Sequence, residues 1–185
     1  DQVLHALTEG SIRERMQQYA VQPGDAFLLY AGTMHYSAGG VLFYEIMQNS
    51  DVIIGLRSRD PALPERERLE WAQTAMEGIH IEPGFECKTQ PLSLPVGPNR
   101  RTFVLACQYF CLERLDLFAP HQIDCGGDRF YVLSQIEGQS SISCRGRHET
   151  LRPGNSCLLP AALPEVTITP QGSAALLKAY LPDLA

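Results

Sequence analysis

The sequence predicts an all-β protein made of two related jelly-roll units, the first incomplete, with short helices at the N-terminus and between the units. One pattern occurs twice, over 24–35 and 154–165: a Pro-Gly turn, a short apolar run, and a polar residue eleven positions after the glycine. From residue 85 onward, short runs of β-forming residues alternate with turn residues. A length of 185 residues, 44% of them hydrophobic and 19% charged, suits one large or two small globular all-β domains.

Helices are expected only before the first strands and in the link between the units. The first helix should end at Gly10, because glycine is a common helix stop. Ser11 and Glu14 have the spacing of a capping box, which predicts a second short helix. Apolar residues at helical spacing predict a third helix over 66–76.

The predicted strands divide the chain into an incomplete unit over residues 1–77 and a complete one over 78–185. Strands are expected over 26–30, 41–47, 52–56, 102–106, 110–117, 129–136, 140–144, 156–159, 165–168 and 174–180, with turns at 137–138 and 170–172. The first unit has too few strands to close a barrel, so its open edge would leave backbone groups unpaired. That edge is expected to pair with chain outside this sequence, with the second unit, or with another molecule, as in a homo-oligomer.

Charge and cysteine content exclude several classes of protein. The net charge of -6 and the lack of a long basic stretch argue against nucleic-acid binding. No apolar run approaches the roughly 20 residues of a membrane span, and no signal peptide is recognisable. The six cysteines include no CxxC pair, which favours reduced thiols and a cytoplasmic protein, with disulfides or a thiolate zinc site as alternatives.

The segment around His35 carries a family resemblance. The spacing Gly-x5-(Pro)-x4-His, here ending at His35, is a motif of cupins, which are jelly-roll proteins. The segments 23–27, 31–35 and 45–51 closely resemble type I mannose-6-phosphate isomerases. Segments 129–133, 158–161 and 180–183 resemble the C-terminal cupin of that family, so the resemblance covers nearly the whole chain.

The resemblance implies a zinc-dependent aldose–ketose isomerase that interconverts mannose 6-phosphate and fructose 6-phosphate, with a sugar phosphate as its partner. His35 matches the last ligand of the family's single zinc ion, and the other ligands would come from a segment before Asp1. Glu45 matches a family carboxylate near the site. Such a reaction moves a proton through an enediol, so it needs an acid/base group and a cation that stabilises an oxyanion.

One position departs from the family pattern. Gly55 stands where the family has a catalytic arginine, and Arg57 or Arg59 are the nearby candidates to replace it. The alternative hypothesis is therefore a non-catalytic cupin relative that binds a sugar, a sugar phosphate or a partner protein. A third hypothesis is a structural fragment that completes a barrel with another chain.

The second unit lacks every residue with which a cupin holds metal. Glu165 replaces the last histidine of the motif, Tyr131 replaces its glutamate, and Asp124 and Gly126 lie near the positions of its paired histidines. We therefore expect this unit to be metal-free and mainly structural. The two histidines outside the motif, His121 and His148, are predicted to be loop residues.

Overall fold

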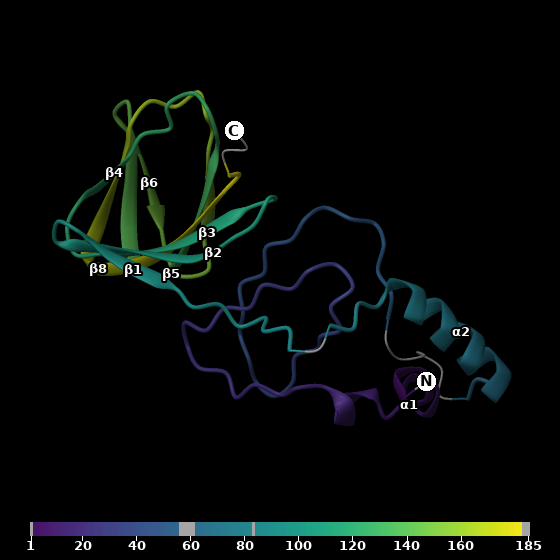
Figure 1. Cartoon of the computed structure of the whole chain (residues 1–185). Coiled ribbons are helices and arrows are strands. Elements are labelled where there is room, and N and C mark those ends of the chain that lie inside the picture. Colours follow the sequence, from purple (N-terminus) through teal and green to yellow (C-terminus); the bar gives the residue numbers. More distant parts are fainter. Residues whose placement is uncertain (1, 56–61, 83, 183–185) are drawn as a thin grey trace. The chain divides into compact units, whose positions relative to one another are not determined.

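The computed structural model describes residues 2–55, 62–82 and 84–182. The chain divides into two compact units, Asp1–Cys87 and Lys88–Ala185 (Figure 1). Residues after the linker helix belong to the first unit, because the His80 amide donates to the Gly32 carbonyl and the Leu28 amide donates to the Cys87 carbonyl. Among the described residues, no helix is long and apolar enough to span a membrane.

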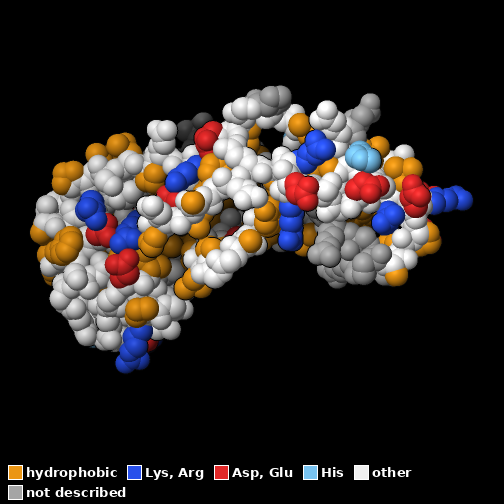
Figure 2. Space-filling view, turned by 90° about the horizontal axis from the view of Figure 1, so that it is seen from below, with side chains coloured by type: hydrophobic (Ala, Val, Ile, Leu, Met, Phe, Trp, Pro, Cys, Tyr) orange, Lys and Arg blue, Asp and Glu red, His pale blue; other side chains and the backbone are white. Residues whose placement is uncertain are grey.

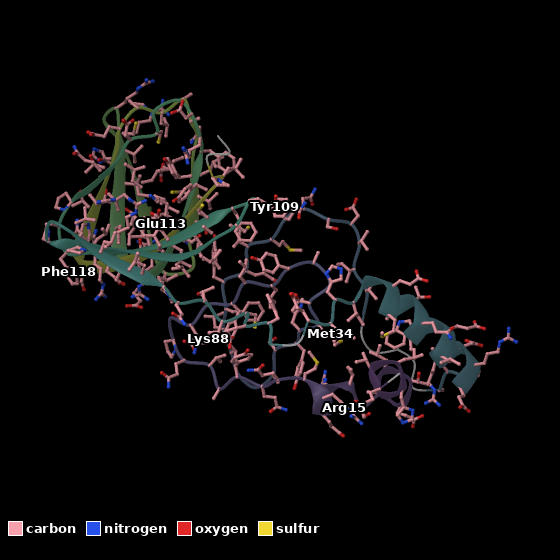
Figure 3. The ribbon with its side chains drawn as sticks, viewed as in Figure 1. Arg15, Met34, Lys88, Tyr109, Glu113 and Phe118 are labelled. Atoms are coloured by element: carbon pink, nitrogen blue, oxygen red, sulfur yellow. The ribbon has the colours of Figure 1, made fainter. Side chains whose placement is uncertain are left out.

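The first unit is organised by its helices, α1 (Gln2–Glu9), the 3-10 helix η1 (Ile12–Arg15) and α2 (Glu65–Gly78). Gly10 has a φ of 78°, a left-handed conformation that ends α1 as predicted. The predicted capping box is wrong, since the Ser11 side chain makes no capping hydrogen bond and η1 is a single short turn. Small and aliphatic side chains join the helices in one core (Ala6, Leu7, Ile12, Ala72 and Ala75), against which Met34 also packs (Figure 3).

The chain between η1 and α2 contains none of the three predicted strands within its described part, residues 16–55. Its apolar side chains are consequently exposed: Leu42 by 99%, Ile53 by 86% and Val52 by 76%. A strand is stable only when a neighbour takes up its backbone hydrogen bonds along its length. In the described part of this stretch, pairing stays local, with an isolated bridge at Phe27 beside the Leu28–Cys87 hydrogen bond. Partial jelly-roll structure in this unit therefore stays a prediction.

The second unit is a jelly roll of eight antiparallel strands, which confirms the predicted fold class (Figure 1). Its strands are β1 (Leu92–Val96), β2 (Asn99–Ala106), β3 (Cys111–Leu117), β4 (His121–Ile123), β5 (Tyr131–Cys144), β6 (Arg147–Leu151), β7 (Ser156–Leu159) and β8 (Val166–Tyr180). The strand order is β1-β2-β3-β8-β5-β6, with β4 added beside β8 and β7 beside β5.

The long strands β5 and β8 take part in both layers of the jelly roll. The first half of β5 pairs with β7 on one side and with the second half of β8 on the other, and that half of β8 also pairs with β3. The second half of β5 pairs with β6 on one side and with the first half of β8 on the other, and that half of β8 also pairs with β4. Each long strand therefore passes from one layer to the other, and this arrangement closes the core.

The predicted turns at 137–138 and 170–172 are irregularities inside these two strands. The register of β5 against β8 shifts between Gln135 and Glu137 and again between Gly138 and Ser140. Gly138 has a φ of 66°, and a Cβ there would lie 2.2 Å from the Ser173 carbonyl oxygen. The glycine thus permits the close approach at which both strands bend.

The space between the layers is filled by aliphatic side chains, including Leu115, Leu117, Leu133, Ile168 and Leu176. All six cysteine thiols are free. On the face of this unit seen in Figure 2, Lys and Arg side chains lie beside Asp and Glu side chains. The buried Asp116 likewise accepts hydrogen bonds from both Arg100 and Arg114.

Candidate functional site

The predicted metal ligand of the first unit, His35, follows a turn in which the Thr33 amide donates to the Tyr30 carbonyl. Its Nδ1 lies 2.9 Å from the Thr33 carbonyl oxygen and donates to it. This bond leaves Nε2 with a lone pair, the arrangement found in most metal-binding histidines. The ring is exposed, and so is the side chain of Glu45.

The described residues do not form a complete metal site around His35. No group of three or more His, Cys, Asp or Glu side chains able to hold an ion occurs in the described part of the chain. Zinc in proteins needs three or four ligands, and His35 with Glu45 would supply at most two. The segments that carry His35 and Glu45 form no strands in the described residues, so the roles of these two residues stay predictions.

The candidates for a catalytic cation cannot be placed. Arg57 and Arg59 both lie outside the described residues. Gly55 is described and lies in irregular chain, where the family pattern would have an arginine. The structure consequently leaves the predicted catalytic pair of a carboxylate and a guanidinium untested.

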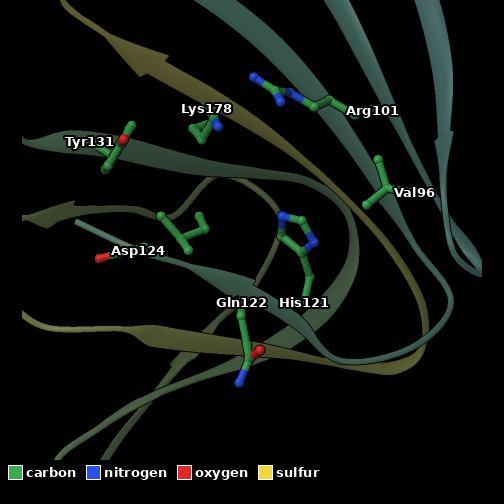
Figure 4. A pocket seen from close by; sticks show the side chains of 8 residues that line it. Val96, Arg101, His121, Gln122, Asp124, Tyr131 and Lys178 are labelled. Carbon is green, nitrogen blue, oxygen red and sulfur yellow. The ribbon is translucent and has the colours of Figure 1, made fainter. Parts of the chain in front are cut away.

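The second unit contains a pocket of about 270 Å³ inside the jelly roll (Figure 4). It is lined by residues from five strands and one loop, namely Val96, Arg101, His121, Gln122, Ile123, Asp124, Tyr131 and Lys178. Asp124 and Tyr131 are two of the positions that replace metal ligands in the motif. A third, Glu165, accepts a hydrogen bond of 2.8 Å from the Gln122 side chain.

The prediction that His121 and His148 are loop residues is wrong. His121 opens β4 and pairs with Ile168, and its half-buried ring lines the pocket. His148 lies on β6, where it pairs with Ser143 and is exposed. Both strands are short and polar, so neither has the apolar alternation by which a strand is recognised.

A buried carboxylate holds the basic side chains of the pocket in place. The Glu113 side chain is fully buried and lies inside the curved sheet (Figure 3). Arg101 binds it with two donors, Nε to Oε2 at 2.8 Å and Nη2 to Oε1 at 2.5 Å. The Lys178 ammonium lies 2.9 Å from Oε2, and the Tyr180 hydroxyl donates to Oε1 at 2.5 Å.

Strand register explains how these side chains meet. Glu113 on β3 is the direct partner of Lys178 on β8, and Arg101 on β2 is the partner of Leu115. Glu113 shares the inward face with Leu115, because alternate residues of a strand point to the same side. A charged residue at a core-facing position of an apolar strand is the sequence signal that could have revealed this cluster.

Aromatic rings complete the surroundings of Lys178. Its ammonium lies 5.3 Å from the ring centroid of Tyr131 and 5.1 Å from that of Tyr180, both within cation–π range. The two rings contact each other edge to face at 5.6 Å. The Arg101 guanidinium stacks in the same way over Phe103 at 4.4 Å.

The electrostatic environment shifts the pKa values of the pocket groups. Burial opposes ionisation of Glu113, but the hydrogen bonds from Arg101, Tyr180 and Lys178 together outweigh it and lower the pKa of this carboxyl. Burial lowers the pKa of Lys178, and the attraction to Glu113 offsets part of that effect. Burial first, and then the charges of Lys178 and Arg101, lower the pKa of His121. The imidazole is therefore neutral at pH 7 beside two cations.

A jelly roll with a pocket between its two layers defines this unit as a cupin. The model of the family described as "Mannose-6-phosphate isomerase, cupin domain" matches residues 99–179. The second unit therefore matches the cupin domain of mannose-6-phosphate isomerases.

Curated relatives extend the similarity over both units. The putative mannose-6-phosphate isomerase YvyI of Bacillus subtilis (strain 168) is 24% identical over 179 residues, which cover 95% of this chain and 54% of the relative. ManA of the same organism, a mannose-6-phosphate isomerase, is 24% identical over 86% of this chain and 50% of its own. GmuF, a probable mannose-6-phosphate isomerase, is 26% identical over 89% of this chain and 55% of its own. The chain thus spans about half the length of the curated relatives it matches.

A solved structure agrees with the fold. The mannose 6-phosphate isomerase from Bacillus subtilis superimposes with a TM-score of 0.50 at 19% identity. The match covers 58% of this chain and 33% of the other.

Proposed function

We propose that this chain belongs to a zinc-dependent aldose–ketose isomerase that interconverts mannose 6-phosphate and fructose 6-phosphate. The observation that carries the proposal is the extent of the similarity. Relatives named as such isomerases match 86–95% of this chain, so the match includes the first unit as well as the cupin domain at 99–179. The first unit is the one that holds His35 and Glu45.

In this proposal the first unit supplies the reacting groups. Glu45 is the carboxylate that takes the proton from one sugar carbon and returns it to the next. Arg57 or Arg59 supplies a cation for the developing oxyanion. His35 offers Nε2 as one ligand to zinc, and the described residues alone do not complete that site, so no step is assigned to the metal. The second unit supplies a stable scaffold.

The test uses a full-length protein with all the chain that its relatives have. His35→Ala should sharply reduce the zinc content measured after dialysis, because each ligand carries a share of the affinity. His5→Ala is the matched control, since His5 is an exposed histidine on α1 and should leave zinc content unchanged. Equal zinc content in the His35→Ala protein and the wild type would overturn the assignment.

A second set of variants tests catalysis separately from metal binding. If Arg57 or Arg59 has replaced the missing arginine, the corresponding alanine variant should lower kcat by about 10²–10³ while zinc content stays constant. An active enzyme that is indifferent to both alanine variants would disprove this role for the loop.

The alternative function is that of a non-catalytic cupin relative that binds a sugar or a sugar phosphate. Gly55 favours it, because a glycine cannot supply the guanidinium that the family pattern has there. In that case neither alanine variant changes a basal rate near zero, and Gly55→Arg raises it. Isomerase assays on the four proteins together distinguish the two functions.

A further inference from the structure

The pocket of the second unit brings together three nitrogen-bearing side chains that the proposed isomerase site does not use. Arg101 comes from β2, His121 from β4 and Lys178 from β8. In Figure 4 the Arg101 and Lys178 side chains and the His121 ring are directed toward the same space. Donors that converge from three separate strands have a fixed arrangement, because each strand is held by its own backbone ladder.

The charges of this cluster do not balance on the inner side of the pocket. Arg101 and Lys178 carry two positive charges, and the buried carboxylate of Glu113 carries one negative charge. Asp124 is the carboxylate among the lining residues; it is exposed and accepts a hydrogen bond of 2.8 Å from the Gly126 amide in its own turn. The amide bond does not neutralise Asp124, so the pocket as a whole is balanced. The excess of one positive charge is local to the side where Arg101, Lys178 and His121 converge, away from the Asp124 carboxylate (Figure 4).

The His121 ring makes no hydrogen bond with any described residue, although it is half-buried. Burial, and then the charges of Lys178 and Arg101, lower the pKa of the ring, so the neutral imidazole can donate one hydrogen bond without adding further repulsion. Its nitrogens are not among the buried, unpaired polar atoms of the described residues, so they are open to a molecule or a water that enters the pocket. A molecule that balances the extra positive charge would also satisfy this ring.

We propose that this pocket binds a small phosphate monoester. Arg101 and Lys178 neutralise the phosphate, and His121 donates to one of its oxygens. Three donors that approach from three directions fit the tetrahedrally arranged oxygens of a phosphate better than the two coplanar oxygens of a carboxylate. Gln122 and Tyr131 line the remaining space and can contact hydroxyl groups of the ester. The volume of about 270 Å³ lies just below the usual range for drug-sized ligands and suits a small metabolite.

The positions of the lining residues support this assignment. Tyr131 occupies the position of a metal-binding glutamate in the cupin motif, and Asp124 lies near the position of a metal-binding histidine. In this pocket positive charge comes from the Lys178 ammonium. Glu113 and the rings of Tyr131 and Tyr180 hold that ammonium in place. The pocket therefore has a positive centre that belongs to the protein itself. This site is independent of the proposed isomerase chemistry, since it lies in the second unit alone.

The test is a titration of the 185-residue chain with inorganic phosphate at constant pH and ionic strength, followed by NMR of the histidine ring protons. Phosphate should shift the His121 signals with a saturable curve and leave those of exposed His148 unchanged. Chloride at the same ionic strength should have no such effect. A missing or non-saturable shift, or an equal shift with chloride, would overturn the proposal.

Two variants keep the proposal falsifiable if one of the basic residues proves essential for folding. His121→Gln lies outside the Glu113 cluster and should weaken phosphate binding, measured by calorimetry, about tenfold or more, the usual effect of losing one hydrogen bond to a charged group. His148→Gln is the matched control and should bind as the wild type does. Equal affinity in all three proteins would show that the pocket does not bind the phosphate.

Discussion

The charge cluster inside the jelly roll predicts a large loss of stability for Glu113→Gln. This change keeps the size of the side chain, removes the negative charge and replaces one of the two acceptor oxygens with an NH2 donor. Lys178 is 11% exposed, so its ammonium cannot recover its hydration when the carboxylate is gone. Removing one partner of a buried ion pair costs about 3–5 kcal/mol. A unit of about 100 residues loses roughly 4–8 °C in Tm per kcal/mol, so we expect a decrease of at least about 12 °C.

Two spectroscopic signals separate the units in this experiment. Far-UV circular dichroism reports the strands, which all lie in the second unit within the described part of the chain. Trp71, the chain's one tryptophan, lies on α2, so its fluorescence reports the first unit. Glu113→Gln should move the first signal and leave the second unchanged.

A matched control and a rescue variant make the result decisive. Arg66 and Glu70 form an ion pair on α2 whose side chains are 89% and 59% exposed. Glu70→Gln should therefore cost less than about 0.5 kcal/mol. Adding Lys178→Met to Glu113→Gln removes the unpaired ammonium and should restore most of the lost stability. A Tm for Glu113→Gln close to that of Glu70→Gln would refute a buried charge cluster.

Three further predictions concern pH, a glycine and activity. The free energy of unfolding of the second unit, measured with urea, should fall below about pH 6.5. The lowered pKa of His121 means that the unfolded chain binds more protons there than the folded chain does, so His121→Gln should make this fall smaller. Gly146→Ala should cost about 1–2 kcal/mol of stability, the strain of a left-handed alanine. Gly138→Ala should cost clearly more, because its new Cβ would also collide with the Ser173 carbonyl oxygen; equal denaturant midpoints for the two variants would contradict this. Coupled-enzyme assays of the 185-residue chain with mannose 6-phosphate should detect little or no zinc-dependent turnover, because its described residues contain no complete metal site.

Local pattern was enough to predict several elements of this protein. The runs at 102–106 and 156–159 form strands β2 and β7, and the helical spacing at 66–76 corresponds to α2. These elements follow from short-range preferences, in which apolar residues at a fixed period are bounded by turn residues. The family resemblance likewise came from short segments, and the comparisons bear it out.

Strand continuity depended on the tertiary structure. Glu137–Gly138 and 170–172 have the composition of turns, yet β5 and β8 continue through them as bulges. A turn and a bulge use the same residues, and what distinguishes them is whether paired chain continues on both sides. Conversely, the apolar runs at 41–47 and 52–55 form no strand among the described residues, because apolar alternation does not create a partner.

The pocket is the clearest case of a site that sequence separation hides. Glu113 and Tyr180 are 67 residues apart along the chain, yet the register of β3 against β8 brings them into contact. The sequence by itself determined which side chains are charged and which strands are apolar. Only the pairing of those strands decided that a carboxylate, a guanidinium and an ammonium would meet inside the jelly roll, since a buried charge is tolerated only where its partners arrive from other strands.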